Sequence, residues 1–221
     1  MERIPPKDRF SQHAASASTP PEILRAAVAA FGMAPDGTAF QRLSGGFMNA
    51  NFSAVSEGGV PVVVRVYSTD MKTAEREFDL LRFLEPFPVS TPKALACFEV
   101  QGRPVVIMEH LSGCTLEDRL LGGEPPDLTV YEDIGAQLGE IHNIRFSDAG
   151  FIGPKVQAGR EYEDFAVFIG QFIEKTLVDL ESRPERLESS LNRRLRRLVR
   201  DKWATVLKTE PVRQLVHTDF N

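Results

Sequence analysis

Residues 40–67 read FQRLSGGFMNANFSAVSEGGVPVVVRVY, and this stretch decides the fold class. Three runs in it have the alternation or the β-branched composition of strands, namely 40–44, 51–57 and 60–67. A glycine-containing turn separates the first two runs, and Gly58-Gly59 is a hairpin signal between the last two. Because turns rather than helices join the runs, the sequence predicts an antiparallel meander and not a βαβ unit.

Helical patterns flank this meander on both sides. Apolar residues recur at helical spacing over 23–31 and again over 73–84. Two more strands are expected on either side of a Gln101-Gly102 turn, at 94–99 and 103–109. Every later periodic segment is helical, at 116–121, 130–144, 162–181 and 184–207. The predicted fold class is therefore α+β, with three parts: a flexible, proline-broken arm over 1–20, a sheet-rich lobe over 21–111 and a helical lobe over 112–221.

Composition places the chain among ordinary globular proteins. It has 221 residues, of which 42% are hydrophobic and 26% charged, and its formal net charge is −5. The negative charge excludes a global cationic field that would recruit nucleic acid or a membrane surface. The apolar runs are far shorter than the roughly 20 residues that span a bilayer. With two cysteines and no visible secretory signal, the sequence predicts a cytoplasmic protein.

Two features could handle phosphate. The turn Ser44-Gly45-Gly46-Phe47-Met48-Asn49 could offer backbone N–H groups to a nucleotide, or it could be an ordinary hairpin turn. Arg65 interrupts a β-branched run. It could grip phosphate and pair with Glu75 or Glu77 on the next helix, or lie exposed on the alternating face. The chain has no GxxxxGK[ST] motif, so a Walker A loop is excluded.

Two further features could complete a nucleotide site. The apolar strand 105–109 opens into a turn over 110–113, where backbone groups could hold the edge of an adenine base. The segment 215–221 reads LVHTDFN and places a His-x-Asp triplet just past a predicted strand. An aspartate there could orient or deprotonate an acceptor hydroxyl group, although such triplets also occur by chance.

The serial order of these features resembles that of a kinase: glycine loop, strand cation, helix glutamate, hinge, helices and His-x-Asp. The sequence is similar to the aminoglycoside phosphotransferase family, relatives of choline and homoserine kinases with the protein-kinase-like fold. The resemblance spans residues 40–221 and rests on LSGGFMNANFSAV, VVVRVY, AEREFDLLRFL, VVIMEHLSGCTL, IGAQLGEIHNI and LVHTDFN. It implies a bilobal fold with an antiparallel-sheet N-lobe and a helical C-lobe. It also implies transfer of the γ-phosphate of ATP to a hydroxyl group of a small molecule.

The resemblance implies roles for single residues. Asp219 corresponds to the catalytic base, and His217 to the histidine that braces its loop. Arg65 corresponds to the strand cation, which is lysine in many members. Glu77, with Glu75 as the alternative, corresponds to the partner of that cation. The other cofactor-binding positions are those of the glycine turn and the adenine hinge: Ser44, Gly45, Gly46, Asn49, Met108, Glu109, His110 and Leu111.

Two departures from the family pattern bear on activity. Thr218 stands where the family usually has glycine. The family also continues past the aspartate to an asparagine and a second aspartate that bind Mg²⁺, whereas Asn221 corresponds to neither ligand. We therefore expect an incomplete C-lobe without these metal ligands, and a truncated chain with negligible phosphotransferase activity. The alternative is a non-catalytic remnant that binds a nucleotide or a partner.

A basic segment is the strongest rival feature. Residues 183–202 carry eight basic and three acidic side chains, which could contact nucleic acid. Apolar residues at helical spacing predict instead that this helix packs along a stripe, with its arginines in solvent. The stripe consists of Leu187, Leu191, Leu195, Leu198 and Val199. The spacing of histidines and cysteines argues against a zinc site. The acceptor stays open among an aminoglycoside, an amino alcohol, homoserine and a sugar adduct.

Overall fold

The computed structural model describes residues 19–43, 49–123, 125–148, 150–157, 165–181, 189–206 and 213–216. Its sheet has the strand order β1-β2-β3-β5-β4 and is antiparallel at every junction. The strands are β1 (Ala39–Arg42), β2 (Asn49–Val55), β3 (Val62–Tyr67), β4 (Ala94–Val100) and β5 (Arg103–Glu109). The predicted antiparallel meander is confirmed.

The helices follow the predicted order. They are α2 (Pro21–Ala30), α3 (Met71–Leu84), α4 (Leu116–Leu121), α5 (Leu128–Asn143), the 3₁₀ turn η1 (Pro154–Val156), α6 (Phe165–Glu181) and α7 (Ser189–Val206). The α+β prediction is therefore confirmed, and the differences lie at element ends. β3 begins two residues later than predicted, because Pro61 has no N–H group for the sheet. Within the described residues, no helix is long and apolar enough to cross a membrane.

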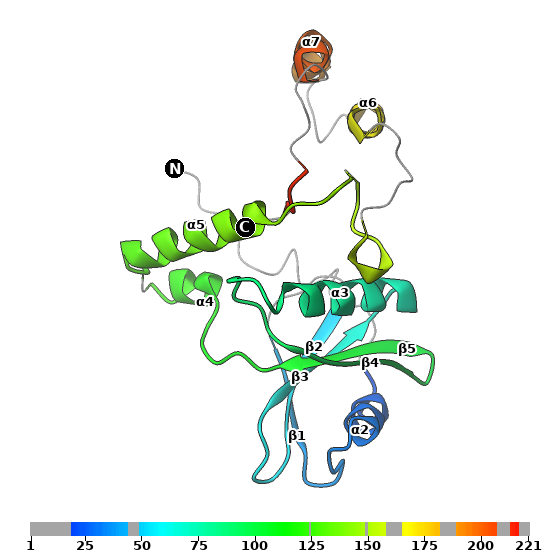
Figure 1. The fold of residues 1–221 in the computed structure, drawn as a ribbon, viewed down its shortest axis with the longest axis vertical. Coiled ribbons are helices and arrows are strands. Elements are labelled where there is room, and N and C mark those ends of the chain that lie inside the picture. The colour runs from blue at the N-terminus through cyan, green and yellow to red at the C-terminus, as the bar shows by residue number, and fades with distance from the viewer. Residues whose placement is uncertain are drawn as a thin grey trace. The chain divides into compact units, whose positions relative to one another are not determined.

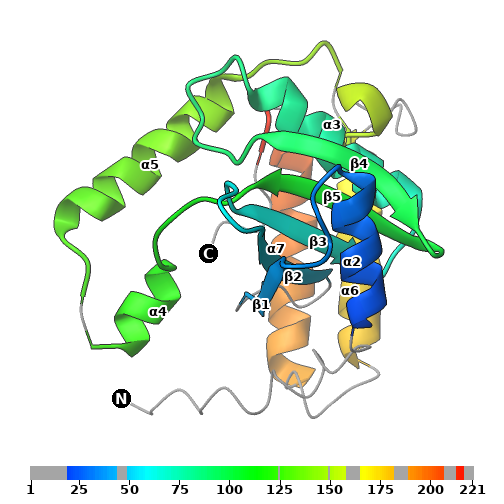
Figure 2. The same cartoon turned by 90° about the horizontal axis from the view of Figure 1, so that it is seen from below.

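The two faces of the sheet are covered by different helices. Figure 1 shows α3 on one side of the strands and α2 on the other, and α2 lies in front of the strands in the view of Figure 2. The larger apolar core lies on the α2 face, where Ile23, Leu24, Ala27 and Val28 of the helix pack against buried residues of four strands. Those strand residues are Ala54, Val62, Val64, Val66, Val100, Val105 and Ile107.

A smaller cluster lies on the α3 face. Ala74 of the helix is fully buried there with Tyr67, Val106 and Met108, and half-buried Phe78 and other apolar side chains pack around them. The side chains of strand β3 therefore alternate between the α2 face and the α3 face of the sheet. Its even-numbered valines enter the α2 core, while Val63, Arg65 and Tyr67 face α3, as the two-residue period of a strand requires.

The contacts divide the chain into two compact units. One comprises residues 1–140 together with 154–156, and the other comprises 141–153 together with 157–221. The division falls inside α5. The predicted lobe boundary near residue 112 stays a prediction.

The second unit contains the approach to the His-x-Asp triplet. Residues 213–216 run antiparallel to 144–146, with an isolated bridge between Arg145 and Gln214. The N–H of Phe146 donates to the carbonyl of Arg213, and the N–H of Leu215 to the carbonyl of Ile144, both at 2.9 Å. Leu215 and Ile144 are buried. The segment before the triplet is thus extended and anchored.

Helices α6 and α7 pack together in the same unit. Arg196 of α7 pairs with Glu174 of α6, and the side chain of Asn192 donates to the carbonyl of Leu177 at 3.4 Å. Leu191 and Leu198 are exposed, so the predicted leucine stripe is only partly correct. The packed face lies one position further along, because Asn192, Arg196 and Trp203 make the contacts with α6. The expectation for Leu187 falls outside the described residues.

Candidate functional site

Arg65 is the centre of a polar cluster on the α3 face. Its Nη1 donates to Oε1 of Glu77 and forms an ion pair with it, while its Nε donates to Oδ1 of Asn51 at 2.8 Å. The side chains of Arg65 and Glu77 remain 27% and 30% exposed. Of the two candidate glutamates, Glu77 is the one that contacts Arg65. The guanidinium group is held from two directions while still reaching solvent.

Tyr67 completes the cluster from beneath. Its hydroxyl group donates to Oε2 of Glu77, so that both carboxylate oxygens of this residue are bonded to β3. Tyr67 is only 1% exposed, and this burial raises the pKa of Tyr67 to about 12. The nearby Arg65 cation lowers the same pKa, but its effect is smaller than that of burial. The phenol is therefore neutral at physiological pH and remains a hydrogen-bond donor.

Strand register and a helix cap bring these groups together. Asn51 lies directly opposite Arg65 in the β2–β3 pairing, so the two side chains share one face. Helix α3 begins at the N-cap Asp70, whose carboxylate accepts from the N–H of Thr73 at 3.0 Å. This bond lowers the pKa of the Asp70 carboxyl group. The cap fixes the first turn of α3, and Glu77 follows Thr73 by about one turn.

Asn49 adds an orphaned acceptor to the same face. It lies opposite Tyr67 in the sheet, and its Oδ1 is buried without a hydrogen-bond partner among the described residues. Burying an amide oxygen without a hydrogen-bond donor lowers the stability of the folded chain, because the oxygen loses its bonds to water. The predicted glycine turn ends at this residue, and Ser44, Gly45 and Gly46 lie outside the described residues. The α3 face of the sheet therefore carries a hydrogen-bond acceptor, Oδ1 of Asn49, that no described side chain uses.

The predicted hinge residues point in different directions. Met108 is buried on the α3 face opposite Val63, whereas Glu109 pairs with Val62 and turns to the α2 face. His110 is half-buried and Leu111 is 56% exposed. Within the described part of the chain, the backbone groups of these last two residues form no hydrogen bonds. Their N–H and C=O groups are thus available to the edge of a flat ligand, while the Glu109 side chain is not directed to the Arg65 face.

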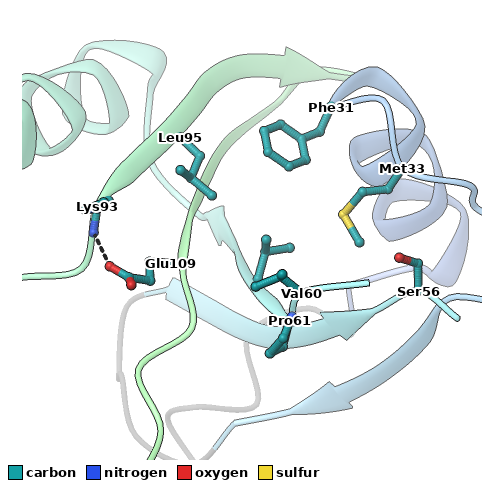
Figure 3. A pocket seen from close by; sticks show the side chains of 9 residues that line it. Phe31, Met33, Ser56, Val60, Pro61, Lys93, Leu95 and Glu109 are labelled. Atoms are coloured by element: carbon teal, nitrogen blue, oxygen red, sulfur yellow. Dashed lines mark hydrogen bonds between the residues drawn. The ribbon is translucent and has the colours of Figure 1, made fainter. Parts of the chain in front are cut away.

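Glu109 instead lines a pocket on the opposite face of the sheet. The pocket has a volume of about 400 Å³ and is lined mainly by apolar side chains, among them Phe31, Met33 and Leu95 (Figure 3). The carboxylate of Glu109 accepts from the backbone N–H of Lys93 at 3.2 Å. The pocket therefore belongs to the α2 face, and it is separate from the polar cluster around Arg65.

Several predicted positions lie outside the described residues. These are the glycine-turn residues named above and the predicted catalytic pair, His217 and Asp219. Their roles stay predictions. Among the residues that the structure does describe, no three histidine, cysteine, aspartate or glutamate side chains gather to hold a metal ion.

Two members of the polar cluster, Asn51 and Tyr67, were not among the site residues predicted from the sequence. A signal for both is present in the alternation, because Tyr67 lies two residues after Arg65 and Asn51 lies on the neighbouring strand. The contact of Asn51 with Arg65 depends on the register of β2 against β3, which the turn between them sets.

The acidic surroundings of Cys97 give a test of the α3 face. Burial raises the pKa of the Cys97 thiol to about 11, with further contributions from Glu75 and Asp79 on α3. Cys114 is exposed. Because thiolates are the reactive form, we expect iodoacetamide at about pH 8 to modify Cys114 well before Cys97, as followed by peptide mass spectrometry. In a Cys114→Ser variant the remaining thiol should react slowly until the chain is unfolded. Equal rates for both cysteines in the folded chain would contradict the described environment.

A five-stranded antiparallel sheet, a helix over one face and an arginine–glutamate pair between them define a kinase-like fold. The model of the phosphotransferase enzyme family (APH) matches residues 39–221, and the chain belongs to this family. No curated protein sequence matches the chain significantly.

Solved structures agree with this fold. Aminoglycoside phosphotransferase APH(4)-Ia is 18% identical over 79% of this chain and 56% of its own, with a TM-score of 0.53. A thermostable mutant of that enzyme, in ternary complex with ADP and hygromycin B, is 17% identical over 85% and 60%, with a TM-score of 0.55. The streptomycin-ATP-APH(2")-IIa ternary complex is 18% identical over 89% and 63%, with a TM-score of 0.50. This chain thus spans less than two thirds of the length of each.

Proposed function

We propose that this chain supplies the nucleotide-binding part of an ATP-dependent phosphotransferase that acts on a hydroxyl group of a small molecule. The observation that carries the proposal is the Arg65 guanidinium group. It has five N–H donors, of which contacts with Glu77 and Asn51 use two within the described residues. The free donors form a planar fork that matches phosphate oxygens.

Each part of the described face has a proposed task. Arg65 binds the phosphates of the nucleotide, and Glu77 keeps the guanidinium group pointed at them. The backbone of His110 and Leu111 receives the adenine edge, beside the buried side chain of Met108. This division follows from the chemistry of the groups, since phosphate needs cationic donors whereas adenine needs an apolar surface with backbone partners.

The transfer step is proposed on residues outside the described ranges. Asp219 would accept the proton of the acceptor hydroxyl group as the hydroxyl oxygen attacks the γ-phosphorus. The bond from that phosphorus to the β,γ-bridging oxygen would break and ADP would leave, while His217 would brace the segment that carries Asp219. Mg²⁺, which the family resemblance implies, neutralises phosphate charge when bound. We assign it no ligand among the described residues.

Support for the acceptor class comes from the relatives. Aminoglycoside phosphotransferase APH(4)-Ia was solved with hygromycin B and with ADP or AMP-PNP, and APH(2")-IIa with streptomycin and ATP. For this chain, a polar small molecule with several hydroxyl groups is the proposed acceptor class.

Nucleotide binding by the full chain tests the proposal. Isothermal titration calorimetry with ATP and ADP should give saturable binding with one nucleotide per chain, and ATP should compete with ADP. Failure of both nucleotides to bind would overturn the proposal. Release of ADP that depends on an aminoglycoside, an amino alcohol or a sugar adduct would then distinguish a phosphotransferase from a protein that binds nucleotide without transfer.

A further inference from the structure

We infer that Asn51 is a positioning residue matched to arginine at position 65, and that it orients the guanidinium plane for phosphate. The inference rests on the proposed function, because it names how the same site controls its cation. Asn51 touches Arg65 rather than any reacting group, so its role is indirect.

Two bonds from different nitrogens fix the guanidinium group. Nε donates to Oδ1 of Asn51 at 2.8 Å, and Nη1 donates to Glu77. One such bond would leave the planar group free to rotate about it, whereas two bonds that are not collinear fix both position and plane. Nη2 has no hydrogen-bond partner in the described part of the chain. It is therefore the nitrogen left to a phosphate oxygen.

The orienting effect of Asn51 depends on a feature that only arginine offers, namely a planar cation. A lysine at this position has a single terminal nitrogen, and its ammonium group acts as a point charge without a plane to orient. Paired with Glu77, such a lysine would gain little from an acceptor at position 51. Asn51 should therefore matter when residue 65 is arginine and lose its effect when it is lysine.

The fold supplies the rigidity that positioning requires. Asn51 and Arg65 are direct partners in the β2–β3 register, and both strands lie inside the sheet between neighbours on each side. Glu77 is in turn held at its second oxygen by Tyr67, which is 1% exposed. Each partner of the guanidinium group is thus itself anchored.

A double-mutant cycle on ADP affinity tests the inference. Calorimetry would compare the full chain with its Asn51→Ala, Arg65→Lys and doubly substituted variants. Asn51→Ala should weaken ADP binding about tenfold when residue 65 is arginine, and less than about twofold when it is lysine. Equal losses in both backgrounds would overturn the inference. Gln41→Ala, an exposed amide on neighbouring β1, is the matched control and should leave ADP binding unchanged.

A second measurement needs no nucleotide. In the ¹⁵N-labelled chain, the Arg65 Nε–H signal, identified by its loss in Arg65→Lys, should exchange slowly with water and exchange faster in Asn51→Ala. Fast exchange in the unsubstituted chain would overturn the inference even if ADP binds. Slow exchange without any ADP binding would instead overturn the proposed function and leave the orienting contact standing.

Discussion

Substitution of Arg65 by alanine is expected to weaken ADP binding by about 10- to 100-fold, the loss typical of a charge-assisted hydrogen bond. Binding of adenosine, which has no phosphates, should change little. The contrast follows from the position of Arg65 in the polar cluster, where its free donors are available to phosphate while the backbone at 110–111 is independent of it. Competition against a fluorescent ATP analogue would measure both affinities.

The control for this variant is Arg42→Ala. Arg42 is an exposed arginine on β1, opposite Phe52 and therefore on the other face of the sheet from Arg65. Its removal should leave both affinities unchanged. An Arg65→Ala variant that binds ADP normally, or one that loses adenosine to the same degree as ADP, would contradict the assignment of Arg65 to the phosphates.

The second large effect is expected in the apolar core. Ile107 lies in the middle of β5 with none of its surface exposed, and it packs in the cluster between the sheet and α2. Truncation to alanine removes buried methyl groups and leaves a cavity that a tightly packed core fills only in part. We expect Ile107→Ala to lower the free energy of unfolding by about 2–5 kcal/mol, as measured by urea denaturation.

A matched leucine lies four residues further along the same segment. Leu111 is 56% exposed, so Leu111→Ala should change the free energy of unfolding by no more than about 0.5 kcal/mol. If the two variants were equally stable, the α2 face would not be the main apolar core of this unit.

Local patterns were sufficient to predict the sheet and its direction. Gly58-Gly59 and the alternation of 62–67 require no knowledge of distant residues, and they predicted the antiparallel pairing of β2 with β3. Arg65 stood out for the same reason, since a cation in a β-branched run is a local anomaly. The nucleotide roles of these residues rest on resemblance and remain proposals.

Other features depend on what a segment packs against. The helical period placed leucines of α7 on one stripe, but the contact with α6 includes Asn192 and Arg196, polar residues that no hydrophobic pattern would select. The direction of Glu109 was also beyond the sequence, because its face is fixed by the pairing with Val62. In both cases the neighbouring element determines which side chains make contacts, and the sequence of the segment alone does not specify where that element lies.

The alternation along β3 has a consequence for misfolding. A slip of this strand by one residue against its neighbours would move the Arg65 guanidinium group into the space that Val64 and Val66 fill beneath α2, among the apolar side chains of the core cluster. The same slip would carry valines to Glu77 and leave that carboxylate without its cation. A misaligned chain would thus be destabilised in two ways: the Arg65 charge would lose its contact with water, and the Glu77 carboxylate would lose its ion-pair partner. The Arg65 charge, which we propose binds phosphate, therefore also disfavours misaligned pairing of β3.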